Sequence, residues 1–164
     1  MTKKAIFLDR DGTIIIDKHY LHDPNQVEYF EDTIEALQLM TNKGYELFMV
    51  TNQSGIGRGM FKVEDMHKVH EKIIKDLMQE GIVIKDVAFC PHSPHENCDC
   101  RKPSPKMILD LMQKHGIEQG FMIGDKAIDA ECGIAAGIEG VHLTNSDSEY
   151  PKFKRLIEFA KSIS

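Results

Sequence analysis

The 164-residue sequence has no long apolar run, no segment with the features of a signal or transit peptide, and no excess of basic residues. A membrane-spanning helix needs about 20 consecutive apolar residues, so the membrane is not an expected partner and a cytoplasmic location is expected. The net charge is −6, whereas nucleic-acid-binding proteins usually present a basic face. Nucleic acid is therefore not an expected partner either.

The sequence also lacks internal repeats, low-complexity tracts and linkers. With 41% hydrophobic and 28% charged residues, its composition is that of an ordinary globular domain. We expect a single domain over residues 1–164 that is large enough to bury a core. We also expect a monomer, because no surplus amphipathic helix is evident.

Cysteine is scarce, and three of the four cysteines lie in one short segment, CPHSPHENCDC at residues 90–100. Cysteines of a cytoplasmic chain are more often reduced or metal-bound than disulfide-bonded. A redox site usually has C-x-x-C spacing, which is absent here. The segment therefore predicts a structural zinc site with four protein ligands, Cys90, His92, Cys98 and Cys100. His95 is a rival ligand, and Cys132 is expected to be a small buried residue.

Apolar runs that are typical of strands alternate with helix-like patterns, which indicates βαβ units and a doubly wound, mainly parallel sheet sandwiched by helices. The expected strands are 4–9, 45–50, 86–90, 120–124 and 139–143. The expected helices are 31–42, 63–80, 104–115, 127–136 and 151–163.

Polar residues follow four of these strands, at Asp9, Thr51 with Asn52, Cys90 and Asp125. The carboxyl ends of parallel strands meet at one edge of the sheet, where ligands bind. One site built from several strand ends is the simplest explanation.

Asp9 and Asp11, in the stretch KAIFLDRDGT, form the centre of this site. Two acids at this spacing can bind a divalent cation, act as a nucleophile or move a proton, although a polar turn would look the same. An EF-hand loop is excluded because Ile14 and Tyr20 stand where it needs Gly and Glu.

Three further segments carry groups that suit a phosphate ligand. The connection 14–30 is either a solvated loop or a flap over the site, with Asp17 and Tyr20 as contacts. TNQSGIGRG at 51–59 offers backbone N–H groups and Arg58, unless it is only a Gly-rich turn. Arg101 and Lys102 follow the cysteine segment directly, so a bound metal would fix these two cations at the sheet edge.

The motifs D-x-D-G-T, a Thr after the second strand, a Lys after the third and G-D-x-x-x-D after the fourth resemble the haloacid dehalogenase superfamily. A response-regulator receiver domain uses similar residues in another chain order. FLDRDGT, VTNQSGIGRG, CPH…CDCRKP and IGDK are most similar to the heptose-1,7-bisphosphate 7-phosphatases, with the histidinol-phosphate phosphatases as close relatives. The resemblance implies a Rossmann-like fold without a large cap domain, and a small phosphorylated sugar as substrate.

The resemblance also implies a role for each matching residue. Asp9 would be the nucleophile and Asp11 the general acid and base. Mg²⁺ would be held by Asp9, the backbone carbonyl of Asp11, and Asp125, while Thr51 and Lys102 would stabilise the transferring phosphoryl group. Substrate contacts would come from Asp17, Tyr20, Asn52, Gln53, Ser54, Arg58, Arg101 and Lys126. Asp129 was expected to orient Lys126 or a metal-bound water.

Three alternatives remain at this point. Histidinol phosphate would use the same chemistry, and the short C-P-H-x₅-C-x-C spacing favours that family, because several heptose enzymes carry a longer insertion. A zinc-stabilised phosphate-binding module without turnover is disfavoured by the intact pair Asp9 and Asp11. A phosphatase acting on DNA ends is disfavoured by the net charge of −6.

Replacing the nucleophile tests the phosphatase hypothesis directly. Asp9→Asn is expected to abolish phosphate release in the presence of Mg²⁺, because a carboxamide cannot form the aspartyl-phosphate. Release of phosphate from a phosphomonoester by the purified variant is the measurement. A variant that is folded and retains the wild-type rate would contradict the mechanism.

Overall fold

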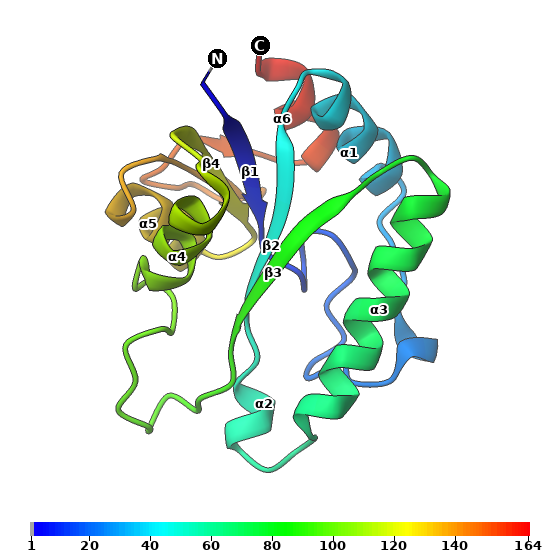
Figure 1. Ribbon diagram of the computed structural model, residues 1–164, viewed down its shortest axis with the longest axis vertical. Coiled ribbons are helices and arrows are strands. Elements are labelled where there is room, and N and C mark those ends of the chain that lie inside the picture. The colour runs from blue at the N-terminus through cyan, green and yellow to red at the C-terminus, as the bar shows by residue number, and fades with distance from the viewer. Residues whose placement is uncertain (1) are drawn as a thin grey trace.

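The computed structural model describes residues 2–164, which form a six-stranded parallel sheet with helices on both faces (Figure 1). The strand order is β3-β2-β1-β4-β5-β6, and each neighbouring pair is parallel. The strands are β1 (Lys4–Leu8), β2 (Glu46–Asn52), β3 (Ile84–Cys90), β4 (Gln119–Gly124), β5 (Glu139–Leu143) and β6 (Lys152–Phe153). The expected α/β fold class is confirmed.

The helices form two layers, because successive residues of a strand point to opposite faces of the sheet. Ile6 and Leu8 of β1 pack in the core with one group of helices, whereas Ala5 and Phe7 pack in a second core. The first layer consists of α1 (Thr33–Asn42), α3 (Val63–Gln79) and α6 (Leu156–Ser162). The second layer consists of α4 (Lys106–His115) and α5 (Ala127–Ala135). All four β1 side chains are fully buried.

The last expected helix, 151–163, is wrong in its first part. Residues Lys152–Phe153 pair with β5 as strand β6, and α6 begins only at Leu156. A strand of two residues is too short to leave a periodic signal, so a sequence pattern cannot distinguish it from the start of a helix. A short helix, α2 (Ser54–Gly57), and a 3₁₀ turn, η1 (Pro24–Gln26), were likewise not expected.

Both chain ends lie at the amino-terminal edge of the sheet, at the top of Figure 1. The backbone carbonyl of Ser164 accepts hydrogen bonds from Lys4 of β1 and from Tyr45. The opposite, carboxyl edge is therefore left to the connecting segments. Among residues 2–164, no helix has the length and apolarity that crossing a membrane requires.

Gly140 allows α5 to pack closely on β5. A Cβ atom at this position would collide with the backbone carbonyl of Ala130. Gly140→Ala is therefore expected to lower the free energy of unfolding by about 1–3 kcal/mol, the usual cost of overpacking. Chemical denaturation measures this change. Glu139→Ala, at the exposed neighbouring position, is the control and should change stability by less than about 0.5 kcal/mol. Equal stabilities of the two variants would contradict the prediction.

Candidate active site

The strand ends bring the expected polar residues together at the carboxyl edge. Asp9 follows β1 directly, and its N–H donates to the carbonyl of Ile123 in β4 at 3.0 Å. Thr51 lies at the end of the neighbouring β2, and Asp125 follows β4. Because β1 lies between β2 and β4, Asp9 stands between Thr51 and Asp125. This is the arrangement that parallel pairing of the three strands requires.

Lys102 is buried in the middle of this edge, with only 3% of its surface exposed. Its ammonium group donates to Asp9 Oδ1 at 2.8 Å, to Asp129 Oδ1 at 2.7 Å and to the carbonyl of Val50 at 3.0 Å. A lysine has three N–H donors, so all three are used. The amine is thereby fixed beside the Asp9 carboxylate.

The charges of this cluster shift one another's titration. Burial and the neighbouring Asp129 carboxylate raise the pKa of Asp9 well above its usual range, although the Lys102 ammonium opposes this. Burial also raises the pKa of Asp125. For Lys102, burial disfavours the charged form, but the carboxylates of Asp129 and Asp9 outweigh it and raise the pKa. The positive charge of Lys102 therefore does not neutralise the acidic groups around it.

The acidic groups fit a divalent cation. Carboxylate oxygens of Asp9, Asp125 and Asp129 lie within 4.8 Å of one another, and Asp125 Oδ1 is buried without a hydrogen-bond partner. Gly12 gives this carboxylate room, because a Cβ there would collide with Asp125. Hard oxygen ligands are those that Mg²⁺ prefers. Asp9 and Asp125 were expected as ligands.

Asp11 is directed away from this group. Its carboxylate accepts hydrogen bonds from Arg10 Nε at 2.9 Å, from Arg10 Nη2 at 3.0 Å and from Gln53 Nε2 at 3.2 Å. The predicted metal ligand of this residue is its backbone carbonyl, so the side chain is free to serve the reaction. Gln53 also donates to Thr51 Oγ1 at 2.9 Å and thus links Asp11 to the end of β2.

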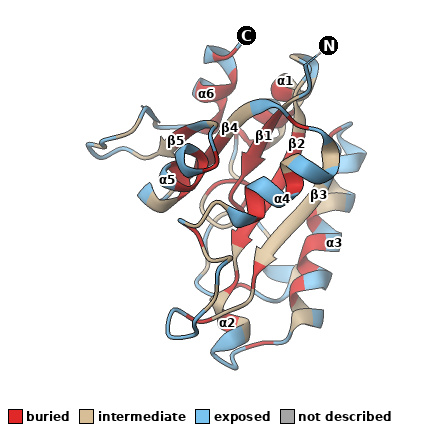
Figure 2. Ribbon diagram, turned by 60° about the vertical axis from the view of Figure 1, so that its left-hand side comes forward, coloured by how far each residue is buried: buried red, intermediate tan, exposed pale blue. Residues whose placement is uncertain are grey.

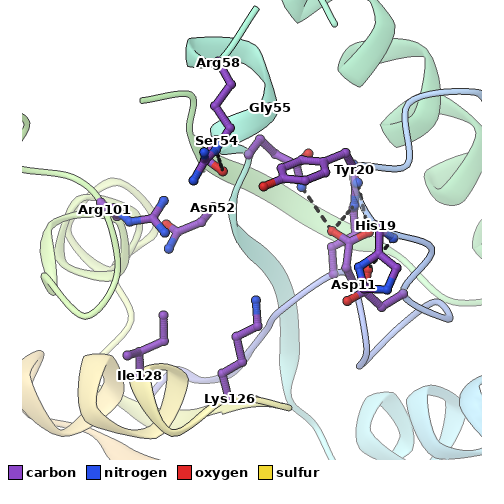
Figure 3. A pocket seen from close by; sticks show the side chains of 13 residues that line it. Asp11, His19, Tyr20, Asn52, Ser54, Gly55, Arg58, Arg101, Lys126 and Ile128 are labelled. Atoms are coloured by element: carbon purple, nitrogen blue, oxygen red, sulfur yellow. Dashed lines mark hydrogen bonds and ion pairs between the residues drawn. The ribbon is translucent and has the colours of Figure 1, made fainter. Parts of the chain in front are cut away.

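An open pocket of about 260 Å³ lies next to Asp11 (Figure 3). All eight predicted substrate contacts line it: Asp17, Tyr20, Asn52, Gln53, Ser54, Arg58, Arg101 and Lys126. Arg10, Asp11, His19, Gly55 and Ile128 complete the lining. Thr51 and Lys102 are not part of the lining and are buried. The roles of these residues stay predictions.

The segment predicted as a flap reaches across to α2. His19 and Tyr20 have positive φ angles of 53° and 59°, which few residues other than glycine adopt. The Arg58 guanidinium lies over the Tyr20 ring at 5.9 Å, and the rings of His22 and Phe61 stack at 5.1 Å. These contacts place Tyr20 at the pocket wall.

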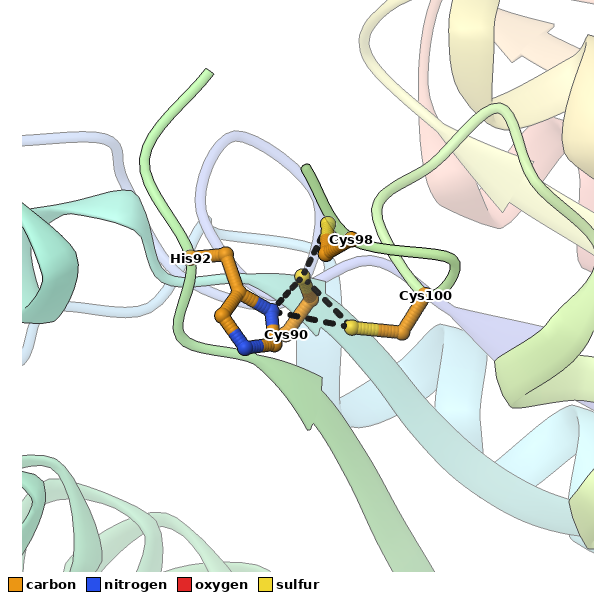
Figure 4. Close-up of side chains that lie close together, drawn as sticks. All are labelled: Cys90, His92, Cys98 and Cys100. Carbon is orange, nitrogen blue, oxygen red and sulfur yellow. Dashed lines mark hydrogen bonds between the residues drawn. The ribbon is translucent and has the colours of Figure 1, made fainter. Parts of the chain in front are cut away.

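The cysteine loop (residues 90–100) gathers its four predicted ligands in one cluster (Figure 4). Cys90 Sγ lies 3.8 Å from Cys98 Sγ and 3.4 Å from His92 Nδ1, and Cys100 Sγ lies 3.3 Å from the same nitrogen. Three thiols and an imidazole at these separations suit tetrahedral zinc, with Zn–S bonds of about 2.3 Å. His95 is exposed and lies outside the cluster.

The cysteine loop is attached to both sides of the pocket. Asn52 Oδ1 accepts a hydrogen bond from the backbone N–H of Lys102 at 3.0 Å. The N–H of Gly57 in α2 donates to the carbonyl of Pro91 at 2.8 Å. The backbone of the loop lies at the surface beside α2 (Figure 2). A metal in this loop would therefore fix Lys102 on one side and α2 on the other.

The contacts of Asp129 and Arg10 were not predicted from the sequence. Asp129 pairs with Lys102 rather than with the side chain of Lys126, whose backbone N–H donates to Asp129 Oδ2 at 3.1 Å. The spacing G-D-x-x-x-D already marked Asp129, but its lysine partner comes from another strand end. Arg10 is 1% exposed, and nothing in the sequence distinguishes a buried arginine from a solvated one.

Comparisons with known proteins place these features in a family. Residues 4–161 match the family model described as polynucleotide kinase 3 phosphatase. The D-glycero-beta-D-manno-heptose-1,7-bisphosphate 7-phosphatase of Helicobacter pylori is 42% identical over 141 residues, covering 84% of this chain and 82% of that protein. The protein of the same name from Rhodopseudomonas palustris is 36% identical over 169 residues, covering 98% and 94%.

The fold is also similar to a crystal structure of D,D-heptose 1,7-bisphosphate phosphatase from B. bronchiseptica complexed with magnesium and phosphate. The TM-score is 0.85 at 25% identity, and the match covers 98% of this chain and 97% of that one.

Loss of one thiol tests the metal site. Cys100→Ser is expected to lower the zinc content of the purified protein from one ion per chain to much less, because a serine hydroxyl is a poor zinc ligand. Elemental analysis after dialysis measures this. Cys132→Ser is the matched control, since Cys132 lies outside the cluster. The Cys100 variant should also release phosphate more slowly, since Lys102 is two residues away. Full zinc content, or full activity without zinc, would contradict the prediction.

Proposed function

The chain belongs to the haloacid dehalogenase superfamily of phosphatases, in the family of the D-glycero-beta-D-manno-heptose-1,7-bisphosphate 7-phosphatases, and we propose that it removes the 7-phosphate of D-glycero-D-manno-heptose 1,7-bisphosphate. One observation carries this proposal: a buried Asp9–Lys102 pair lies beside an acidic metal-type cluster, next to a pocket lined by Arg58, Arg101 and Lys126 in addition to the paired Arg10.

In the first half-reaction, Asp9 attacks the phosphorus of the 7-phosphate and forms a covalent aspartyl-phosphate. The bond between phosphorus and the sugar oxygen breaks, and Asp11 donates a proton to that oxygen. Lys102 stabilises the negative charge of the transferring group, because its ammonium already lies 2.8 Å from Asp9 Oδ1. Asp9, Asp125 and the backbone carbonyl of Asp11 would hold Mg²⁺, which would supply positive charge to neutralise the phosphate dianion.

In the second half-reaction, Asp11 is a carboxylate and takes a proton from water. The resulting hydroxide attacks phosphorus, the bond to the Asp9 carboxylate oxygen breaks, and inorganic phosphate leaves. Asp11 is protonated again and Asp9 is restored. Thr51, at the end of the neighbouring strand β2, stabilises the transferring phosphoryl group through its hydroxyl.

The charge of the pocket supports a substrate with a second phosphate. Arg58, Arg101 and Lys126 line it, and arginine binds phosphate oxygens through two parallel N–H groups. Arg101 Nη1 is buried without a hydrogen-bond partner and would gain one from a phosphate. Histidinol phosphate carries an ammonium group instead, which would meet these three cations. Of the two carboxylates in the lining, Asp11 is paired with Arg10 and Asp17 accepts the backbone N–H of His19.

The setting of the reaction is part of the proposal. We place the enzyme in the cytoplasm as a monomer, where its cysteines stay reduced and available to zinc. The match to the family model of polynucleotide kinase 3 phosphatase makes DNA ends an alternative substrate. The net charge of −6 opposes binding to a polyanion, so a small sugar phosphate is favoured.

The test is phosphate release with Mg²⁺ from heptose 1,7-bisphosphate, histidinol phosphate and a 3′-phosphorylated oligonucleotide, measured side by side. We expect the highest kcat/KM for the heptose bisphosphate, because it offers a second phosphate monoester to the pocket. Histidinol phosphate has none, and the net charge of −6 opposes binding of the polyanionic oligonucleotide. A higher value for either other substrate would overturn the assignment of the substrate, while leaving the aspartyl-phosphate chemistry in place.

The pocket arginines should account for recognition of the second phosphate. Arg101→Met is expected to reduce kcat/KM for heptose 1,7-bisphosphate by roughly tenfold or more, since a charge-assisted hydrogen bond contributes about 1.5–3 kcal/mol. Heptose 7-phosphate, which lacks the second phosphate, should lose much less. Arg155→Met, a matched change outside the pocket lining, is the control. Equal losses on both sugars would show that Arg101 does not bind the 1-phosphate.

A further inference from the structure

Arg10 is the largest fully buried side chain among the described residues, with 1% of its surface exposed. Charged side chains are almost never buried unless they are paired. Arg10 lies between Asp9 and Asp11 in the sequence, and in the structure its guanidinium contacts the Asp11 carboxylate but not that of Asp9. The mechanism above does not use it. The mechanism therefore does not explain why this charged side chain is buried.

The guanidinium holds the Asp11 carboxylate in one orientation. Arg10 Nε and Nη2 donate to the two carboxylate oxygens at 2.9 and 3.0 Å. This bidentate geometry fixes the plane of the carboxylate. Gln53 adds a third donor at 3.2 Å. With both oxygens engaged, the side chain of Asp11 has one favoured direction, beside the pocket that it lines (Figure 3).

The other end of the guanidinium is anchored in two further segments. Nη2 also donates to the carbonyl of Leu21, in the flap, at 3.1 Å. Nη1 lies 3.2 Å from His70 Nε2 on α3, and because arginine can only donate, this nitrogen accepts. Burial, the Arg10 charge and His67 lower the pKa of His70 to about 3, so the ring is neutral and able to accept. Arg10 thus joins Asp11 to the flap and to α3.

We infer that Arg10 is a positioning residue for proton transfer: it aims the Asp11 carboxylate at the leaving oxygen and ties that orientation to the flap. The inference rests on the proposed acid–base role of Asp11. A carboxylate remains on Asp11 once its proton has passed to the leaving alcohol, and the Arg10 charge stabilises that state. The same ion pair then holds the carboxylate ready to accept a proton from water.

Leaving-group dependence separates positioning from a structural role. A sugar alcohol leaves poorly without a proton, whereas p-nitrophenolate leaves readily as an anion near neutral pH. General-acid catalysis contributes typically about 10²–10⁴-fold in rate, and this contribution is needed only for the alcohol. A variant that misplaces Asp11 should therefore be slow on the sugar phosphate and much less impaired on p-nitrophenyl phosphate.

The experiment compares the single-turnover rate of leaving-group release at saturating enzyme, which reports the first half-reaction and not the water step that both substrates share. The substrates are heptose 1,7-bisphosphate and p-nitrophenyl phosphate, and the proteins are the wild type, Asp11→Asn, Arg10→Met and Arg10→Lys. Arg155→Met is the matched control, because Arg155 pairs with Asp32 away from the pocket. Circular dichroism and thermal unfolding establish that each variant is folded. His70→Leu, which removes the acceptor at Nη1, replaces Arg10→Met if that protein does not fold.

We expect Asp11→Asn to lower the ratio of the two release rates, heptose bisphosphate over p-nitrophenyl phosphate, by roughly 100-fold or more. Arg10→Met should lower it by roughly tenfold, Arg10→Lys by less, and Arg155→Met should leave it unchanged. Equal losses on both substrates in the Arg10 and His70 variants, with a selective loss in Asp11→Asn, would overturn the inference alone. Equal losses in Asp11→Asn would overturn the proposed role of Asp11 itself.

Discussion

The site depends on one ammonium group that two buried carboxylates share. Lys102 satisfies all three of its N–H groups with Asp9, Asp129 and a β2 carbonyl. A buried charge without partners is costly, and removing one member of such a set leaves the others uncompensated. The position of Asp9, the orientation of α5 through Asp129 and the path of the loop after β3 are therefore set together.

The surrounding segments hold Lys102 in position. Lys102 is not on a strand, so its backbone has no sheet partner to hold it, and Asn52 binds its N–H instead. The cysteine loop ends two residues earlier, and its four ligand-type side chains come from the end of β3 and from the loop itself. A small domain without a cap has little apolar material with which to fix a loop at its edge. A metal ion bound by this cluster would provide that rigidity through a few strong bonds.

Much of this could be predicted from the sequence, because its main features are periodic or local. Alternating strands and helices indicated the parallel sheet, and parallel strands bring Asp9, Thr51 and Asp125 to one edge whatever the details of packing. The cysteine cluster could be predicted because its four ligand-type residues lie within eleven residues of one another, at positions 90–100. The eight predicted pocket residues lie together for the same reason, since they follow strand ends or flank such loops.

What could not be predicted depends on which side chains meet across the fold. The pairing of Asp129 with Lys102 joins segments 27 positions apart, and the contact of Arg10 with His70 spans 60. Hydrophobic periodicity in the sequence does not predict which distant side chains contact each other. The two-residue strand β6 was missed for a different reason, because its pairing with β5 defines it and its own sequence does not.

The pocket residues come largely from connecting segments, while the charged cluster stands at the ends of strands and the start of a helix. Residues such as Tyr20, Arg58 and Arg101 add nothing to the sheet, so their replacement leaves the framework and the reacting groups in place. Loops tolerate change in length and composition better than the elements they connect. A lineage with this architecture can thus acquire new substrates by altering three surface segments, and it keeps its way of breaking a phosphate ester while doing so.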